Sequence, residues 1–489
     1  MSYGGTAQNQ RGIALLGIMV LMLVLSLLGA TLLNLAGQEA ISVGAGKEAA
    51  VAQQLADAAG DLVVGWFHRP STSPRAIATL LAKRYQTSEG WPSFFDQSGH
   101  SQFVGSFDRP DLQLDSRNSS DDLLLNDATA GLFRSLRGVG RVLQLKLYAP
   151  SRLGLLCTID ATVETDHPVP ARQSMTVQLS ALDLPALRSG VQVGQGLGLS
   201  GSGEESIVWA HWGPAKVGGD LVVRRVDDIP IVRLTAPIDG QRYDQMAVRE
   251  DRWAEIWVGG VVQIMQPPPG QTGEPSLPTN VHVQQVPIPG LPLDRWDYHL
   301  LKQVAVQHGS YYAVDQDGFL HPNGLVQPGE GLSPDEVFRS TSVGDQRGLI
   351  FIDTLDQSAP RTDNLGTVKL RAGYFEGLVV VQGHIQLQPG MSGQTVAMLS
   401  PPSGVSGGTS SRLPVQVSGI HLNGVLYAAG NITITGTARI VGSVTAGGTI
   451  AAAAAGASLE VWHNDDMSRG LFEGLPVVYR APGTWMVRY

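Results

Sequence analysis

Residues 12–38 contain no charged side chain, and this run of 27 residues limits what the chain can fold into more than any other feature. As an α-helix rising about 1.5 Å per residue it would be about 40 Å long, which exceeds the hydrocarbon thickness of about 30 Å. A secretory signal has a shorter apolar region of about 7–15 residues with a small-x-small cleavage site after it, and neither fits here. The run therefore predicts a membrane-spanning helix. Arg11, the charged side chain that precedes it, favours a cytoplasmic N-terminus.

The helix is predicted to continue beyond the membrane. No proline occurs before Pro70, so nothing forces the helix to end at the bilayer surface. Apolar residues then recur at spacings of four, three, four and four: Val51, Leu55, Ala58, Leu62 and Trp66. This spacing places them on one helical face, which is predicted to pack on a soluble domain.

Residues 11–67 resemble the N-terminal region of type IV pilus minor pilins of the PilX kind. The likeness is carried by "QRGIALL", the long apolar run, "GQEA" and the later "AVAQQLADAAGDLVVGWF". In that family the N-terminal helix is a membrane anchor before assembly and the filament core afterwards. The resemblance implies a short leader, residues 1–12, which a prepilin peptidase would cut between Gly12 and Ile13, leaving residues 13–67 as the pilin-type helix. Small residues such as Gly17 and Gly29 would let neighbouring helices approach closely.

The resemblance implies a minor subunit, because major pilins carry a glutamate at the fifth mature position, where this chain has Gly17. The implied protein is a single-pass protein of the bacterial inner (cytoplasmic) membrane, with its ectodomain in the periplasm or on the cell surface. It would take part in pilus assembly or adhesion, with other pilins and assembly proteins as partners. Two alternatives stay open. One is a K-type minor pseudopilin of a type II secretion system, a family whose added domain is largely helical, and the other is a surface protein that never enters a filament.

Residues 68–194 are predicted to form a pilin-like α/β region with a loop insertion. Residues 86–122 are rich in Ser, Asp, Gly and Phe without periodicity, which is typical of loops, whereas residues 126–139 have a helical pattern. After them, "RVLQLKLYA", "GLLCTIDATVET" and "RQSMTVQLSAL" alternate as strands do. A helix followed by an antiparallel β-meander is the plan that the resemblance favours.

A glycine motif recurs in residues 195–489. One glycine is followed six residues later by a second, and then by aliphatic residues two and four positions further on. Copies start at Gly213, Gly377, Gly424 and Gly442, and the last two lie 18 residues apart. This length suits one coil of a β-solenoid, with glycines at the corners and aliphatic side chains inside. The side chains predicted inside include Ile432, Ile434, Ile440 and Ile450, whereas Thr433 is predicted outside.

The predicted fold is therefore mainly β, with a long N-terminal helix, a β-meander and a β-solenoid ectodomain. An irregular β-sandwich is the alternative, since only two copies of the motif lie in tandem. Residues 224–376 separate two copies and are predicted to be a helix-containing insertion. That insertion contains a proline-rich loop, a helix that begins at Asp294 and ends at Gly309, and a strand at 347–355.

Charge and motif spacing argue against an enzyme, a cofactor or metal site and a nucleic-acid partner. The net charge is −9, without a basic block. The best solenoid segment, residues 377–459, has no Asp or Glu with which to build a catalytic pair. The Asp315–Gly318 turn is followed by Phe319, which breaks the pattern of a calcium loop. Cys157, the single cysteine, lies in an apolar run and is predicted to be buried.

We predict that the mature chain starts at Ile13, because "QRG" directly before an apolar helix offers a prepilin peptidase its junction. N-terminal sequencing of membrane-extracted protein from cells with the peptidase should read Ile-Ala-Leu-Leu. Replacing Gly12 by a bulkier residue such as Val should block processing without preventing insertion, because the apolar run stays intact. An unprocessed start at Met1 or Ser2 would contradict the prediction.

Overall fold

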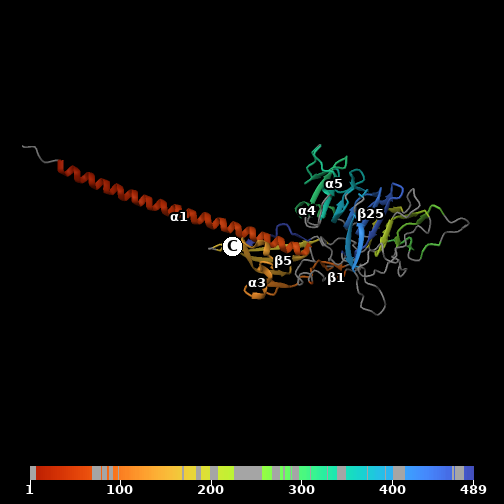
Figure 1. The fold of residues 1–489 in the computed structure, drawn as a ribbon, viewed down its shortest axis with the longest axis horizontal. Coiled ribbons are helices and arrows are strands. Elements are labelled where there is room, and N and C mark those ends of the chain that lie inside the picture. Colours follow the sequence, from red (N-terminus) through yellow and green to blue (C-terminus); the bar gives the residue numbers. More distant parts are fainter. Residues whose placement is uncertain are drawn as a thin grey trace, which may run out of the picture.

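The computed structural model describes residues 7–68, 92–167, 170–182, 189–198, 208–224, 256–266, 281–286, 297–338, 349–399, 414–464 and 478–488, apart from residues 97, 309, 328, 372, 391 and 392, and a few short pieces between these ranges. The chain begins with one continuous helix, α1 (Ala7–His68), of 62 residues. Figure 1 shows that the first half of α1 projects away from the rest of the molecule, whereas the second half lies against a β-sheet. The predicted continuation of the helix beyond the apolar run is confirmed.

The second half of α1 and an antiparallel sheet form what we call the helix-and-meander domain. Its strands are β3 (Leu112–Asp115), β4 (Gly140–Tyr148), β5 (Cys157–Thr165), β6 (Arg172–Ala181), β28 (Val478–Arg480) and β29 (Met486–Arg488). The sheet order is β28-β6-β5-β4-β3, and β29 also pairs with β6. The three predicted meander strands are β4, β5 and β6, which pair consecutively and antiparallel.

The face by which α1 packs on this sheet is shifted from the predicted stripe. Leu55 and Trp66 are buried, but Val51, Ala58 and Leu62 are only half-buried. The centre of the contact is made of smaller residues: Ala52, Ala56, Ala59 and Val63. The physical reason is the close approach of the helix to the sheet. A Cβ on Gly60 would collide with the Met175 side chain of β6.

Two further large sheets contain most of the other strands of the ectodomain. The larger contains β7 (Val191–Val193), β9 (Val208–His211), β10 (Ala215–Val217), β12 (Ile256–Val258), β14 (Val281–His282), β15 (Ser310–Val314), β16 (Leu320–Pro322), β17 (Leu349–Asp353), β19 (Phe375–Val381), β23 (Leu422–Ala428), β25 (Thr437–Ala446) and β27 (Ser458–Trp462). The smaller contains β8 (Gly196–Gly198), β11 (Asp220–Val223), β13 (Val262–Ile264), β18 (Thr367–Leu370), β20 (His384–Leu387), β24 (Ile432–Ile434) and β26 (Thr449–Ala452).

These strands are arranged as a β-solenoid. The path through the larger, twelve-stranded sheet is β14-β12-β10-β7-β25-β23-β19-β17-β15-β16, and off this path β27 pairs with β25 and β9 pairs with β27. The seven-stranded sheet has the order β13-β11-β8-β26-β24-β20-β18. Neighbouring coils therefore place a strand in each sheet, as β23–β24 and β25–β26 do, and they pair in parallel. Only β15–β16 among the described pairs of these sheets is antiparallel.

Glycines form corners of the coils, and the first glycines of three motif copies stack on one another. A Cβ on Gly442 would collide with the carbonyl oxygen of Gly424, and a Cβ on Gly424 with that of Gly377. Their φ angles of 140°, 156° and 118° lie in a region that residues with side chains rarely adopt. The spacing found in the sequence thus reflects a column of glycines along the solenoid.

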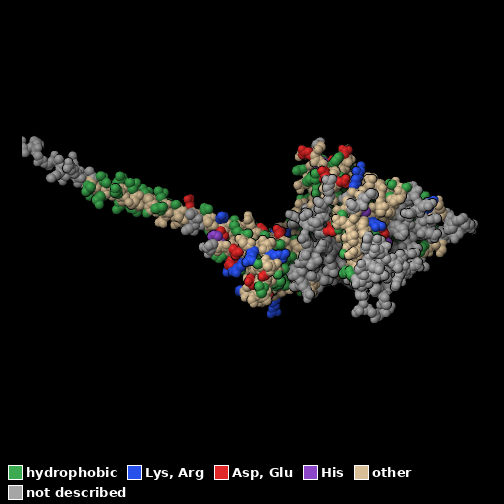
Figure 2. Space-filling view, viewed as in Figure 1, with side chains coloured by type: hydrophobic (Ala, Val, Ile, Leu, Met, Phe, Trp, Pro, Cys, Tyr) green, Lys and Arg blue, Asp and Glu red, His purple; other side chains and the backbone are tan. Residues whose placement is uncertain are grey.

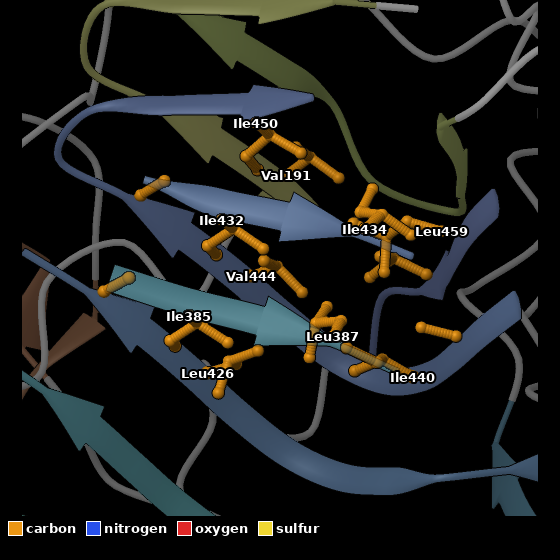
Figure 3. Packing of buried hydrophobic residues seen from close by; sticks show 14 of the residues in the cluster. Val191, Ile385, Leu387, Leu426, Ile432, Ile434, Ile440, Val444, Ile450 and Leu459 are labelled. Atoms are coloured by element: carbon orange, nitrogen blue, oxygen red, sulfur yellow. The ribbon is translucent and has the colours of Figure 1, made fainter. Parts of the chain in front are cut away.

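Aliphatic side chains fill the space between the two sheets. Ile432, Ile434, Ile440 and Ile450 are each at most 2% exposed, and Figure 3 shows them among the packed side chains between the strands. Thr433, in contrast, lies on the outer side and is half-buried. The structure has the inside–outside register that the motif predicts.

The coils do not follow one another in space as they do in sequence. From β7–β8 the chain adds β10–β11 and β12–β13 and reaches β14 at one end. It resumes at β15, at the opposite end, and winds back through β17, β19 and β23 to β25. There the last coil meets the first, because β25 pairs with β7 and β26 pairs with β8. We call this junction the seam.

The seam makes the solenoid an insertion in the helix-and-meander domain. β6 ends at Ala181 and pairs there with Val478, the first residue of β28, and every solenoid strand lies between them in sequence. The structure therefore differs from the predicted boundary at 194/195. β7 lies before that boundary, and the C-terminal strands belong to the first sheet.

The structure also differs from the prediction that residues 224–376 form an insertion, because these residues contribute coils to the solenoid. The strands β12–β13, β15 and β17–β18 all lie within it and pair with the coils of the glycine motif or with one another. The motif does not reveal these coils. In the β12–β13 coil, for example, Gly260 is present but Ala254 stands six residues before it.

Helix α4 (Tyr298–His308) joins the two domains. Tyr298, Leu301 and Val304 of α4 are buried in a cluster that also contains outer-face residues of β17, β19 and β23. The same cluster includes Leu182, which directly follows β6, and Tyr479, which lies in β28. The predicted helix is present, although its predicted ends, Asp294 and Gly309, lie outside the described residues.

The remaining elements are small. They are β1 (Tyr85–Gln86), β2 (Pro92–Ser93), α3 (Ser119–Asn126), η1 (Arg134–Leu136), α5 (Pro334–Val337) and a hairpin of β21 (Gln394–Leu399) and β22 (Pro414–Ile420). The prediction of a helix over residues 126–139 is wrong, because α3 ends at Asn126, where the predicted helix should begin. Asp127 Oδ1 instead accepts hydrogen bonds from the backbone of Thr129 and Ala130 and closes a turn.

We expect Ile434→Asp to destabilise the ectodomain by several kcal/mol, because an unpaired carboxylate would be buried in the solenoid core. Thr433→Asp should leave stability nearly unchanged, since this neighbour faces outwards. Urea denaturation combined with limited proteolysis measures both effects. Equal tolerance at the two positions would contradict the register.

Candidate functional site on the N-terminal helix

The first half of α1 exposes the large apolar side chains that it carries. From Leu15 to Leu35 their exposed fractions run from 46% at Val24 to 76% at Leu33. Figure 2 shows these side chains as a continuous hydrophobic surface on the projecting part of the helix. The mean hydropathy reaches 2.6 over 18 residues, with none of that window buried. The chain thus has an N-terminal helix long and apolar enough to span a membrane.

Polar side chains within this surface are few, and Thr31 bonds to the helix itself. Thr31 donates its hydroxyl hydrogen to the carbonyl oxygens of Leu27 and Leu28, at 3.0 and 2.8 Å. A hydroxyl that bonds to the preceding turn can enter lipid or a protein interface without an unpaired donor. Thr31 therefore does not prevent the projecting half of α1 from lying in an apolar surrounding.

The predicted site residues all lie on this helix. Gly12 and Ile13 fall within α1, where the backbone continues without interruption, and cleavage between them stays a prediction. A Cβ on Gly17 or Gly29 would meet no atom within 4 Å, so no described part of the chain fills either position. The two glycines are twelve residues apart, which is about 120° around a helix, so they open different faces. Their role in helix packing also stays a prediction.

The second half of α1 is fastened to the C-terminal strands by polar contacts. Arg480 of β28 donates to the carbonyl oxygen of Asp57 at 3.0 Å and pairs with the Asp61 carboxylate at 2.8 Å. The Trp485 indole donates to Asp57 Oδ1 at 2.9 Å. These contacts fix the direction in which the apolar half leaves the domain.

A buried carboxylate ties together the ends of β4, β5 and β6, three strands of the sheet on which α1 packs. Glu164 pairs with Arg172 and with Arg141, each at 2.7 Å, and its side chain is only 7% exposed. Hydrogen bonds from Arg172 and Arg141 hold the pKa of Glu164 below its ordinary value. Glu48 of α1 places its Oε1 atom 3.7 Å from Nε2 of His167, which follows β5. Sequence reasoning missed these pairs because strand register and the packing of α1, rather than local spacing, bring the partners together.

A second polar cluster lies where α4 meets β15 and β17. The Asp353 carboxylate is fully buried and accepts hydrogen bonds from Tyr298 at 2.9 Å and Tyr311 at 2.6 Å, and it pairs with Lys302 at 2.6 Å. Burial raises the pKa of both tyrosines. Thr354 donates its backbone N–H to the same carboxylate. With both oxygens engaged, the cluster is arranged to hold α4 on the solenoid.

The other residues singled out in the sequence have structural surroundings. Asp315 accepts backbone hydrogen bonds from Asp317 and Phe319 and lies 2.9 Å from His321, which closes the turn before β16. Cys157 is buried in the helix-and-meander core, where burial raises the pKa of its thiol. Among the residues described, three or more potential metal-binding side chains nowhere gather into one group.

Comparisons with known proteins add little to this geometry. No family model matches the chain, and no curated protein matches it. Among solved structures, the chain is similar to the crystal structure of the competence-associated pilin ComZ from Thermus thermophilus. The two are 12% identical with a TM-score of 0.23, over 74% of this chain and 86% of that chain. A likeness at this level carries no weight for fold or function.

Proposed function

We propose that the protein is a non-enzymatic, membrane-anchored, minor pilin-like subunit that takes part in type IV pilus assembly. The observation that carries the proposal is α1, a single helix with an exposed apolar half and a second half fixed on an antiparallel sheet. Such a helix is equally suited to lipid and to a bundle of similar helices, because neither requires polar partners. The resemblance of residues 11–67 to PilX-like pilins supports the same role.

The position of the solenoid supports a place at the end of a filament. It lies beyond the sheet, at the end of the molecule opposite the projecting half of α1 (Figure 1). In a bundle of parallel, staggered helices, the next subunit away from the membrane would lie ahead of the helix-and-meander domain. The solenoid already fills that direction, so repeated incorporation would bring subunits into collision. A low-copy subunit at the distal end avoids this, and it would display the solenoid for surface contact.

The structure also bears on the K-type pseudopilin alternative. That family's added domain is largely helical, whereas the described part of this insertion contains α4 and α5, of 11 and 4 residues, against two β-sheets. We therefore favour the pilus over the secretion system. A surface protein that never enters a filament remains the rival that experiment must separate.

The test replaces Gly17 and Gly29 by leucine. Membrane residence needs only length and hydrophobicity, so the double variant should fractionate with membranes at normal levels. A packed helix bundle also needs matching shape, and the added side chains would hold neighbouring helices apart. We therefore expect the variant to disappear from sheared surface filaments, as measured by immunoblotting of both fractions.

Ser26→Leu is the matched control, because it also adds apolar surface to α1 but replaces a residue that already has a side chain. It should remain in the filaments. Wild-type protein absent from sheared filaments would refute the proposal and favour a fixed anchor. Equal amounts of wild type and double variant there would show that the two glycines do not lie at the packing surface.

A further inference from the structure

The two sheets of the solenoid differ in what covers their outer faces. On the twelve-stranded sheet, α4 packs over β17, β19 and β23 in a hydrophobic cluster. Next to it, the β21–β22 hairpin packs on Val441 and Trp462. The outer side chains of the seven-stranded sheet are instead exposed or half-buried. We call this surface the open face. It consists of the outward residues of β8, β11, β13, β18, β20, β24 and β26.

Strand pairing places the side chains of the open face in rows across the strands. In one row, Lys369, Gln386, Thr433 and Ala451 are successive partners. In the other, Thr367 pairs with His384. Further along, Thr449 pairs with Gly196 and Gly196 with Asp220. Because neighbouring strands are about 4.8 Å apart, these rows present polar groups at a regular spacing along the solenoid axis.

The middle of the open face is polar but uncharged. Its charged residues lie towards the ends, with Lys369 on the edge strand β18 and Asp220 on β11. Asp220 is already engaged, since its carboxylate accepts hydrogen bonds from Val261 and Gln263. The side chains of Gln386 and Thr433 make no hydrogen bond to any part of the chain that the structure describes, and so they keep their hydrogen-bonding capacity for an outside partner.

The centre of the open face also carries only small residues, so the backbone there is less covered by side chains. Ala451 of β26 is exposed, and a Cβ on the neighbouring Gly198 would lie 3.8 Å from the Cβ of Ala451, in ordinary contact. Gln386 and Thr433 lie in the same row on one side of these small residues, and Val222 lies on the other. A flat ligand lying across the strands could therefore approach the backbone at β26 and β8, next to the amide of Gln386 and the hydroxyl of Thr433.

The composition of the face selects among ligand classes. A nucleic acid or acidic polymer needs several cations, and the face offers Lys369 alone. A protein partner is usually held by buried aromatic or large apolar anchors, and Val222 is the one large apolar side chain directed outwards here. A neutral polyhydroxylated chain needs repeated hydrogen-bond donors and acceptors without charge, which the rows of Thr and Gln provide.

We propose that the open face binds a neutral polysaccharide, lying along the solenoid axis across β20, β24, β26 and β8. The contacts would be hydrogen bonds between sugar hydroxyls and the side chains of Gln386, Thr433 and Thr449. This binding concerns the solenoid alone and does not depend on membrane anchoring or on pilus assembly. It would give a displayed solenoid a class of surface to contact.

The experiment is affinity gel electrophoresis of the detergent-solubilised full-length chain in gels containing hydroxyethylcellulose, laminarin or soluble starch, with polygalacturonate as the anionic comparison. Wild type should be retarded by at least one neutral glycan. The double variant Gln386→Glu/Thr433→Asp should bind that glycan at least about tenfold more weakly, because hydrated carboxylates would replace neutral hydrogen-bonding groups. The matched control Gln394→Glu/Gln416→Glu adds the same charge to exposed positions of the hairpin and should bind as wild type.

Thermal unfolding by circular dichroism establishes that each variant is folded. Ala451→Arg provides a second test at an exposed position, since its long side chain would block the centre of the open face and should weaken binding equally. The proposal is overturned if no neutral glycan retards wild type, if the open-face variants bind as wild type does, or if polygalacturonate binds more tightly than every neutral glycan.

Discussion

At the seam, backbone pairing joins two stretches of chain that are remote in sequence. Val444 and Ala446 of β25 lie beside Val191 and Val193 of β7, and β26 continues the contact to β8. The Ser443 hydroxyl donates to the Ser189 carbonyl at 2.7 Å across a separation of 254 residues. Closing so long a loop costs conformational entropy before any contact forms. The parallel pairing and the shared aliphatic core on both sides of the seam must offset that cost.

The rest of the architecture follows from this closure. Because the first and last coils are neighbours, the chain enters and leaves the solenoid close together, and β28 can pair with β6. β28 in turn brings Arg480 to Asp57 and Asp61, which orient α1. The direction of the apolar helix thus depends on a C-terminal strand that the closed solenoid brings beside β6. Helix α4 strengthens the junction, since its cluster contains residues of both domains.

Local patterns in the sequence predict local structure well and long-range order poorly. The uncharged run, the alternating meander strands and the inward register of Ile432 and Ile434 all depend on spacings within a few residues. The cyclic order of the coils depends instead on which strand pairs with which, and parallel strands of similar composition do not encode this locally. The coil at β12–β13 was missed for a simpler reason, since Ala254 replaces the expected first glycine.

The candidate site on α1 likewise has features that the sequence predicts and contacts that it does not. The apolar half of α1 and its glycines are visible in the sequence, because exposure to lipid or to other helices imposes a continuous pattern. The contacts that position the helix are not visible. Gly60 meets Met175, and Arg480 reaches Asp57 and Asp61, only once the fold brings distant residues together. The open face likewise exists only as a product of strand register.

Disulfide trapping tests the seam most directly. Gly196 and Thr449 are partners across β8 and β26, so cysteines at these positions should cross-link on oxidation. Gln263 and Thr367 lie on the opposite edge strands, β13 and β18, which would be neighbours only if the coils followed the sequence order. Cys157 is buried and should not compete. Peptide mass mapping should find the 196–449 disulfide and no 263–367 disulfide, and the reverse result would contradict the seam.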